Sequence, residues 1–578
     1  MADYRNEYLR WLNSSFIDAG TRKELESIKG NEKEQEERFY TELNFGTAGI
    51  RGIIGAGTNR MNIYVVRRAA AGLAEYLLKT PDGKERGTAI AYDSRNFSKE
   101  FAHETACVLA FYGIKVYLYS TLHSVPQLSF AVRELHTKAG VVITASHNPP
   151  EYNGFKVYWE TGGQCGPKQA DEILSCIKKI DYFDVRTADY DTAVKQGLIK
   201  LIGKEIDEIY YKKTQSLMLN AETVRLHGAD INIVYTPLHG SGCVPVSEML
   251  RRIGASNVFI VPEQKEPDGN FPTVKAPNPE DPNTFTLAIQ LADKVNSDLI
   301  IATDPDSDRL GVAVRGRDGR FRMLTGNQIG SILTYYLLSE MKAKGTLPEN
   351  GFVAKSLVST RLADVICRKF GVEMKEVLTG FRFIAEQIDI AEESKKSRFI
   401  FGFEESYGSL AGGFAHDKDA ICAAMLVCEA AIVFKQRGLT LYDLLERIFD
   451  EFGYFAEKTK AYTLTGKAGI EKIASAMRAL RQEPIKVFAD EKVKLYEDFL
   501  LGRRVDYVNN AQSATTLPKS DVLRFLFDDE GWAVIRPSGT EPKLKFYAGV
   551  RGKTRQEADE KLEKLLCAAD EIISDLLR

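Results

Sequence analysis

Short apolar runs that end in polar loops recur along the chain. The four clearest are AGVVITASHNPP, SDLIIATDPDSDRLGVAV, SRFIFGFEESYG and WAVIRPSGTEPKLKFYAGV. Between them lie stretches with apolar residues at helical spacing, such as residues 361–371, which end in a glycine at the C-cap position. Because β-rich runs alternate with helical ones, the pattern predicts α/β layering.

Two longer stretches predict helices with different surroundings, and the N-terminal stretch differs from a signal peptide. Residues 420–434 are almost entirely apolar, but they are too few to span a bilayer and include Glu429, so we expect a buried helix. Residues 554–578 place apolar side chains at helical spacing and predict an amphipathic helix on the last sheet. The first fifteen residues are charged and amphipathic, unlike a signal peptide.

The length of the chain predicts several domains. It has 578 residues, whereas a single hydrophobic core stops growing at roughly 250–300 residues. We place boundaries near 205, 325 and 455, which gives four domains at residues 1–205, 206–325, 326–455 and 456–578. Each carries one of the four loops, and we expect the loops to share a central cleft.

Composition narrows the class of protein. The formal net charge is -3 and there is no basic block, so we expect neither a nucleic acid nor a membrane as partner. The eight cysteines form no CxxC pair and no zinc-like spacing. In a chain of this size they predict reduced, mostly buried thiols and a cytoplasmic protein.

Three alternating aspartates lie between the apolar runs DLIIAT and LGVAV. In an extended loop the side chains of Asp304, Asp306 and Asp308 point the same way. Such close carboxylates repel one another unless protons or a cation intervene, and a hard divalent ion is the natural partner. Arg309 and Arg315 stand where an EF-hand needs its glycine and glutamate, which excludes that motif. A solvated acidic turn remains the alternative.

The segment TASHNPPEYN (144–153) follows the apolar run AGVVI. Two consecutive prolines cannot continue a helix or a central strand, so this is a loop at a strand end. Loops on a rigid scaffold often carry the chemistry of a protein. On its own residues alone, Ser146 is a nucleophile, a cap or part of a plain turn.

The segment RPSGTEPKLKF has the components of a phosphate-binding loop. Arg536 offers a bidentate fork, Ser538 and Thr540 offer hydroxyls, and Gly539 lets backbone N–H groups approach an anion. It is not a Walker loop, because no GxxxxGK[ST] occurs in the chain. A plain hairpin turn fits the segment equally well.

Two further loops are compatible with ligand binding. In GFEESYG, Glu404 accepts hydrogen bonds and Ser406 both donates and accepts them, which suits the recognition of sugar hydroxyls. A helix start at Glu405 or Ser406 is the alternative. FGTAGIRG (45–52) predicts a glycine-rich turn that places Arg51 near an anion, or a plain turn.

Taken together in this order, five segments resemble the α-D-phosphohexomutase superfamily, the phosphoglucomutases and phosphomannomutases. They span nearly the whole chain: FGTAGIRG, TASHNPPEYNGFKVYW, DPDSDRLG, GFEESYG and RPSGTEPKLKF. Secondary matches are AYDSR (91–95), YTPLHGSG (235–242), PNPE (277–280), TGFRFI (379–384) and HDKDA (416–420). The length and the NGFKVYW after the serine are most similar to the long phosphoglucomutase/phosphopentomutase branch.

The resemblance implies roles for individual residues. Ser146 carries a phosphoryl group and, with Asp304, Asp306 and Asp308, binds one Mg²⁺ ion, for which Mn²⁺ or another hard ion could substitute. Arg51, His147 and Lys156 surround that phosphate as catalytic residues, with Lys156 as a proton shuttle. The substrate-binding residues implied by the later motifs are Arg309, Thr379, Gly380, Glu404, Ser406, Lys418, Arg536, Ser538, Gly539 and Thr540.

The resemblance also implies a fold and a reaction. The fold class is α/β, with three related mixed α/β domains and a C-terminal α+β domain around a central cleft. The reaction interconverts α-D-glucose 1-phosphate and glucose 6-phosphate through a phosphoserine and glucose 1,6-bisphosphate, which is both intermediate and activator. The implied partners are small sugar phosphates, and the implied assembly is a monomer or a dimer.

The sequence leaves other substrates and other classes of protein open. Gly539, Phe381 and Gly408 depart from the asparagine or histidine of shorter relatives, which leaves the preferred sugar open: phosphomannomutase or phosphopentomutase activity, or synthesis of glucose 1,6-bisphosphate. A serine hydrolase is disfavoured because no GxSxG elbow occurs and His147 directly adjoins Ser146. A noncatalytic metal- or sugar-binding protein is the third possibility.

Overall fold

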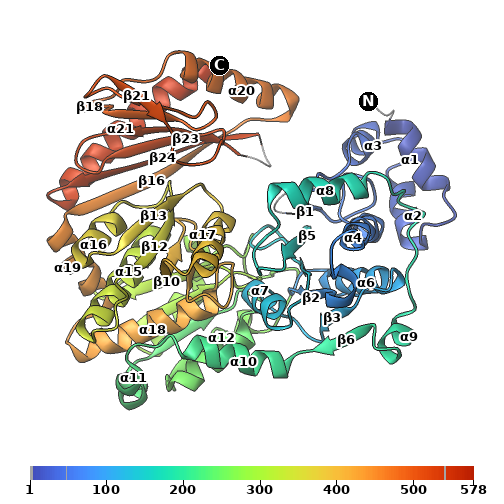
Figure 1. Ribbon diagram of the computed structural model, residues 1–578, viewed down its shortest axis with the longest axis horizontal. Helices are drawn as coiled ribbons and strands as arrows, with labels where there is room; N and C mark the ends of the chain where they lie inside the picture. Colours follow the sequence, from blue (N-terminus) through green and yellow to red (C-terminus); the bar gives the residue numbers. More distant parts are fainter. Residues whose placement is uncertain (1–3, 47–48, 539–541) are drawn as a thin grey trace. The chain divides into compact units, whose positions relative to one another are not determined.

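The computed structural model describes residues 4–46, 49–538 and 542–578 (Figure 1). The chain divides into two compact units. The first comprises the residues up to Thr325 together with Ala385–Phe401 and Ser406–Thr440. The second comprises Gly326–Ile384, Gly402–Glu405 and Leu441–Arg578.

A six-stranded sheet begins the first unit, with the order β1-β5-β4-β2-β3-β6. The central strands β4, β2, β3 and β6 are parallel, whereas β5 runs antiparallel to β4 and β1 antiparallel to β5. The strands are β1 (Ile50–Ile53), β2 (Thr88–Tyr92), β3 (Val116–Tyr119), β4 (Ala139–Ile143), β5 (Tyr152–Trp159) and β6 (Ile199–Ile202).

Helices connect these parallel strands and cover the sheet. Those of this region are α1 (Tyr4–Asn13), α2 (Ala19–Ser27), α3 (Glu32–Phe39), α4 (Ile63–Leu77), α5 (Gly83–Arg86), α6 (Ser98–Phe111), α7 (Val125–Glu134), α8 (Pro167–Ile177) and α9 (Tyr190–Lys195). The chain passes from β2 through α6 to β3, then through α7 back to β4 beyond β2. Right-handed crossovers in opposite directions place α6 and α7 on opposite faces. The loops after β2 and β4 therefore leave the sheet side by side, where open α/β sheets bind their ligands.

A second sheet follows in the same unit, with the order β11-β10-β9-β7-β8. Its strands are β7 (Ile233–Thr236), β8 (Val258–Ile260), β9 (Leu299–Thr303), β10 (Leu310–Arg315) and β11 (Phe321–Leu324). Its helices are α10 (Lys204–Gln215), α11 (Ala221–His227), η1 (Gly228–Asp230), α12 (Cys243–Ile253), α13 (Pro262–Lys265), η2 (Pro282–Phe285) and α14 (Thr286–Lys294). The antiparallel pair β9 and β10 is fully buried except for Arg315. Residues 304–309 connect these two buried strands.

Two later segments complete the first unit. The helix α17 (Phe381–Ser394) and the strand β14 (Arg398–Phe403) each cross from one unit to the other along the chain, and β15 (Ser409–Ala411) and α18 (Ala420–Gln436) belong to the first. Every residue of α18 from Ala420 to Phe434 is buried, which confirms the predicted buried helix. Within the described residues we find no helix with the length and apolar character that crossing a membrane requires.

The second unit contains a seven-stranded antiparallel sheet with the order β16-β24-β23-β22-β19-β20-β21. Its strands are β16 (Tyr454–Thr463), β19 (Leu495–Asp498), β20 (Arg503–Asp506), β21 (Ala511–Ala514), β22 (Leu523–Leu526), β23 (Trp532–Pro537) and β24 (Lys543–Gly552). The strands β17 (Val487–Phe488) and β18 (Glu491–Lys492) precede β19 along the chain and form a separate two-stranded sheet. The helices α20 (Gly466–Gln482) and α21 (Arg555–Leu577) accompany this sheet. Buried residues of α21, such as Leu565, share one core with Phe546 of β24, which confirms the predicted C-terminal helix.

The remainder of the second unit is α/β. Strands β12 (Gly351–Ser356) and β13 (Glu373–Val377) pair in parallel, and the helices are α15 (Gly326–Ala343), α16 (Leu362–Phe370) and α19 (Leu441–Phe452). Helix α16 ends at Gly371, whose φ of 71° is left-handed. Glycine adopts this conformation without strain, so the predicted C-cap is confirmed.

Candidate active site

Ser146 lies in the loop that follows β4, as the two prolines predicted. Its side chain is buried and its φ is 52°, an uncommon conformation for a residue with a Cβ. The backbone N–H of Ser146 donates to Thr144 Oγ1 at 2.8 Å, which holds this strained turn. The Ser146 hydroxyl donates to Asp304 Oδ2 at 2.9 Å and lies 3.1 Å from His147 Nδ1. One hydroxyl is thus held directly against the aspartate loop.

The three predicted metal ligands, Asp304, Asp306 and Asp308, lie together. All three are buried, and one oxygen from each lies within 4.8 Å of the others. The expectation of an extended loop is wrong: Ser307 has a left-handed φ of 52° and its N–H donates to the carbonyl of Asp304 at 3.0 Å. A tight turn, rather than strand-like alternation, brings the carboxylates together.

The electrostatics of this aspartate cluster suit a cation. Burial, followed by the charges of Asp306 and Asp308, raises the pKa of Asp304 well above its usual range. Among the described residues, Asp306 Oδ1 and Asp308 Oδ1 are buried without a hydrogen-bond donor. Such oxygens are costly unless a partner satisfies them. Buried carboxylate oxygens are the ligands that Mg²⁺ and similar hard ions prefer, so the residues fit such an ion.

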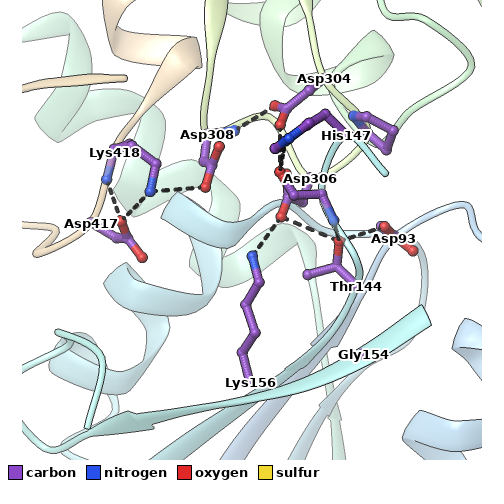
Figure 2. Close-up of polar contacts among 12 residues, drawn as sticks. Asp93, Thr144, His147, Gly154, Lys156, Asp304, Asp306, Asp308, Asp417 and Lys418 are labelled. Carbon is purple, nitrogen blue, oxygen red and sulfur yellow. Dashed lines mark hydrogen bonds and ion pairs between the residues drawn. The ribbon is translucent and has the colours of Figure 1, made fainter. Parts of the chain in front are cut away.

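Two lysines contact the same cluster, as Figure 2 shows. Lys156 extends from β5 and donates to Asp306 Oδ2 at 2.9 Å. Burial opposes ionisation of Asp306, but the Lys156 ammonium lowers the pKa of this carboxyl below its usual range. Lys418 lies 3.0 Å from Asp308 Oδ2 and 3.0 Å from Asp417 Oδ1. Two buried cations therefore lie beside the aspartates, where a phosphoryl group would be attracted.

Lys418 is held by a carboxylate that our sequence prediction did not include. Asp417 is buried, and its Oδ2 accepts hydrogen bonds from Tyr158 at 2.7 Å and Gln164 at 3.0 Å. Burial raises the pKa of Asp417, but Lys418 and the Tyr158 hydrogen bond outweigh it, so the pKa lies below its usual range. The motif HDKDA contained Asp417, but only the packing of β5 against it reveals its function as the partner of Lys418.

Three further predicted residues belong to the same region of the first unit. Arg51 lies on β1 rather than in a turn, paired with Gly154 of β5, and donates to Asn148 Oδ1 at 2.9 Å. The backbone N–H of Arg309 donates to Asp304 Oδ1 at 3.1 Å, and its guanidinium contacts Glu280 of PNPE. Burial, then the cations Arg309 and Arg51, lower the pKa of His147 well below its usual range, so its imidazole is neutral near pH 7.

The remaining predicted substrate ligands lie mostly in the second unit. Glu404 is buried and accepts a hydrogen bond from the N–H of Gly380 at 2.7 Å, next to Thr379. Arg536 is near the end of β23, and Ser538 donates from its N–H to the carbonyl of Lys543 at 2.7 Å across the hairpin. Gly539 and Thr540 lie outside the described residues. Ser406 belongs to the first unit, although Glu404 belongs to the second.

The loop after β2 supplies residues that the sequence prediction missed. Thr144 Oγ1 donates to Asp93 Oδ2 at 2.6 Å and lies 3.2 Å from Asp306 Oδ2 (Figure 2). These contacts link the loop between β4 and β5, residues 144–151, to the aspartate cluster, and we call it the serine loop. Arg95 donates to main-chain carbonyls of the serine loop. The match at AYDSR was the only sequence signal for Asp93 and Arg95, and it gave no indication of their partners.

Comparison with known proteins identifies the family. Models of the phosphoglucomutase/phosphomannomutase family match the chain in order: α/β/α domain I at residues 42–184, α/β/α domain II at 208–318, α/β/α domain III at 325–452 and the C-terminal domain at 476–564. A phosphoglucomutase of Staphylococcus saprophyticus is 39% identical over 533 residues, which cover 92% of this chain and 95% of that protein.

Solved structures agree on the fold. A putative phosphomannomutase from Thermus thermophilus has a TM-score of 0.67 at 22% identity, covering 92% of this chain and 99% of that one. The phosphoglucomutase pp63/parafusin from Paramecium has a TM-score of 0.69 at 17% identity, covering 93% and 96%. With four matched domains in order and a relative this similar over nearly its whole length, the chain belongs to the phosphoglucomutase/phosphomannomutase family of α-D-phosphohexomutases, with their four-domain α/β architecture.

Proposed function

We propose that the chain is a phosphoglucomutase that interconverts α-D-glucose 1-phosphate and glucose 6-phosphate through a phosphoryl group carried by Ser146. The observation that supports this proposal most directly is the contact of the Ser146 hydroxyl with Asp304 at 2.9 Å. A serine hydroxyl is a weak nucleophile at its ordinary pKa, and a buried cluster of carboxylates alone would repel a phosphate. A cation bound to those carboxylates reverses that repulsion.

The metal ligands in this proposal are Asp304, Asp306, Asp308 and Ser146, with Mg²⁺ as the ion. The superfamily uses a metal ion, and among the described residues the aspartate cluster is a fully buried group of carboxylates that could hold one. When bound, the ion neutralises negative charge on the transferring phosphoryl oxygens. Lys156 and Lys418, which contact Asp306 and Asp308, add positive charge on the protein side.

Each half-reaction exchanges a phosphoryl group for a proton. In the first, the bond from phosphorus to Ser146 Oγ breaks, a bond to the sugar O6 forms, and the O6 proton ends on Ser146 Oγ. The resulting glucose 1,6-bisphosphate turns end for end. In the second, the bond from phosphorus to O1 breaks, the bond to Oγ re-forms and the proton ends on O1. Lys156 is our candidate for carrying this proton, because its Nζ contacts Asp306 in the same aspartate cluster that Ser146 contacts through Asp304.

Phosphoryl transfer depends mainly on positioning and on electrostatic stabilisation. The chain's own residues contribute both: the turn of Ser146 fixes the hydroxyl, and Arg51 and His147 line the same loop. We assign recognition of the sugar hydroxyls to Glu404 and Ser406 and to the Thr379–Gly380 turn. Arg309 and Lys418 are assigned to the substrate, and the non-reacting phosphate to Arg536, Ser538, Gly539 and Thr540.

A coupled assay tests the proposed reaction. Glucose 6-phosphate formation from glucose 1-phosphate is followed with a dehydrogenase, with a trace of glucose 1,6-bisphosphate as activator. Parallel reactions with mannose, ribose and N-acetylglucosamine 1-phosphates compare kcat/KM values. We expect glucose 1-phosphate to give the highest value. A higher kcat/KM for another sugar phosphate would make that compound the preferred substrate and would leave the phosphoserine chemistry in place. No turnover of any of them would refute the proposal.

A further inference from the structure

Arg95 lies directly behind the serine loop and is almost fully buried, with 3% of its surface exposed. It belongs to the loop after β2, which leaves the sheet beside the loop after β4. Its guanidinium Nη1 donates to the carbonyls of Pro149 at 2.9 Å and Tyr152 at 3.1 Å. Its Nη2 donates to the carbonyl of Ser146 at 2.5 Å and to that of Asn148. One side chain thus binds four main-chain carbonyls between Ser146 and Tyr152.

This set of contacts accounts for polar groups that the loop leaves unpaired. The residues from Ser146 to Glu151 belong to no helix or strand, and β5 begins at Tyr152. The carbonyl of Pro149 also accepts from the Tyr152 N–H at 3.1 Å, and that of Glu151 accepts from the Ile54 N–H at 2.7 Å. The carbonyls of Ser146 and Asn148 are therefore the ones for which Arg95 matters most as a donor. A guanidinium has five N–H groups in a fixed planar fork and cannot lose its proton. Arg95 therefore gives the loop the donors that regular secondary structure would have supplied.

Neighbouring contacts fix the same two loops to each other. Asp93 accepts from the Arg95 N–H at 3.0 Å and from Thr144 Oγ1 at 2.6 Å. At the far end, the Asn153 amide donates to the carbonyl of Asn96 at 2.9 Å and to Ser98 Oγ at 3.0 Å. The serine loop is therefore tied to the 93–98 loop at its start, along its length and at its end.

The outer face of Arg95 meets a turn from the second sheet region of the same unit. The guanidinium carbon lies 4.9 Å from the centre of the Phe271 ring, and Phe271 is completely buried. Beside it, the Asn96 amide donates to Asn270 Oδ1 at 3.0 Å. The aromatic face restricts the plane of the guanidinium and so restricts where its four hydrogen bonds can point.

We propose that Arg95 is a positioning residue that holds Ser146 in line for phosphoryl transfer by fixing the carbonyls of its loop, without contacting the substrate. The proposal rests on the function proposed above and adds a residue to it. Because a misplacement of about 1 Å can cost about 10²-fold in rate, a shift of the serine loop should lower kcat far more than it raises KM.

The test compares Arg95 with a matched arginine elsewhere in the unit. Arg68 is also buried (7% exposed), its Nε donates to the carbonyls of Ile177 at 3.2 Å and Ile180 at 2.7 Å, and it stacks 4.3 Å from the Tyr182 ring centre. None of these partners belongs to the serine loop. Arg95→Lys, Arg95→Met, Arg68→Lys and Arg68→Met are assayed for kcat, KM and the rate at which glucose 1,6-bisphosphate phosphorylates Ser146.

We expect Arg95→Lys to lower kcat by about 10- to 100-fold and Arg95→Met by more, with KM for glucose 1-phosphate changed by less than about threefold. Lysine retains the charge and part of the donor capacity, so it should rescue part of the loss seen with methionine. The Arg68 variants should keep wild-type kcat per folded molecule, even where their unfolding midpoints fall as far. Equal kcat values for Arg95→Lys and Arg68→Lys would overturn the proposal, and so would a change confined to KM.

Hydrogen exchange of the full wild-type chain supplies a second readout that needs neither a folded variant nor turnover. If Arg95 fixes the loop, the amides of Ser146 and Asn148, which donate to Thr144 Oγ1 and to the carbonyl of Ala145, exchange as slowly as those of β4. Fast exchange of these amides in the native chain would overturn the proposal. If the wild-type chain turned over no sugar phosphate, the proposed function would fail while this exchange test of Arg95 would still stand.

Discussion

Replacing Asp419 by asparagine tests the electrostatics of the segment that carries Lys418. Asp419 caps α18: its Oδ1 accepts from the N–H of Cys422 at 2.8 Å, and both oxygens accept from Tyr210 at 2.8–2.9 Å. The residue is completely buried. Burial raises the pKa of Asp419 from 3.8 to about 6, although the hydrogen bonds from Cys422 and Tyr210 oppose the rise.

The sign of the pH effect follows from this raised pKa. A carboxyl with a raised pKa in the folded state holds its proton more tightly there than in the unfolded chain. Its contribution to the free energy of unfolding is therefore complete below the unfolded pKa and is lost as the pH rises through the folded pKa. A rise from 3.8 to about 6 corresponds to about 3 kcal/mol of unfolding free energy. About half of this, roughly 1.5 kcal/mol, is lost between pH 5 and pH 8. Asparagine keeps the capping oxygen and has no charge to bury.

The measurement is hydrogen exchange of the α18 amides in the wild type and in Asp419→Asn at pH 5, 6, 7 and 8. Comparing the two chains at the same pH cancels the intrinsic pH dependence of exchange. The opening free energy of the variant should rise relative to the wild type by about 1.5 kcal/mol from pH 5 to pH 8. A difference that stays constant, or that falls with pH, would refute the reasoning.

Asp189 provides the control. It caps α9 in the same way, with Oδ1 accepting from the Thr192 N–H at 2.9 Å, but it is exposed. Hydrogen bonds from Thr192 lower the pKa of Asp189. Its contribution to stability is present above its unfolded pKa and is lost only as the pH falls through the lower folded value. Asp189→Asn should therefore show no trend between pH 5 and pH 8.

Three further predictions concern the buried charges. Arg524 pairs in the second unit with Glu497, which is buried, and with Glu376, which is partly exposed and also lies 3.3 Å from Lys355 Nζ. Because Arg524→Met takes this cation away from the buried Glu497, urea unfolding should show a loss of about 3 kcal/mol, and a loss below about 1 kcal/mol would contradict the burial argument. Adding Mg²⁺ should raise the thermal midpoint of the wild type, since an ion that binds only the folded chain stabilises it, and Asp308→Asn should lose most of that rise; an equal rise in both would place the ion elsewhere. Lys156→Met should lower kcat by about 10²-fold or more in the coupled assay if this ammonium relays the proton, and unchanged kcat would remove Lys156 from the mechanism.

Much of the fold was predictable because hydrophobic periodicity reports local structure. The buried run of α18, the amphipathic pattern of α21 and the glycine after α16 each predicted an element that the structure contains. The pattern did not reveal that the chain passes between the two units at residues 402–406. Which unit a segment joins depends on contacts between residues far apart in the sequence, and such contacts leave no periodic signal in it.

The candidate site was predictable where its residues act through their own side chains at short spacing. Asp304, Asp306 and Asp308 stand two residues apart, and the structure places them together, although through the left-handed turn at Ser307. Arg95 has no such pattern because its partners are main-chain carbonyls more than fifty residues away. Every residue type carries a main-chain carbonyl, so the residues of the serine loop do not indicate that Arg95 binds them. Only the three-dimensional structure reveals these contacts.

The central claim is that Ser146 carries the phosphoryl group, and intact mass spectrometry tests it most directly. The wild-type chain is incubated with glucose 1,6-bisphosphate, then with excess glucose 1-phosphate, beside Ser146→Ala. We predict that the wild type gains about 80 Da, the mass of one phosphoryl group on Ser146, and loses it to the sugar, while Ser146→Ala gains nothing and converts no glucose 1-phosphate. A phosphoryl group mapped to another residue, or full turnover by Ser146→Ala, would contradict the account.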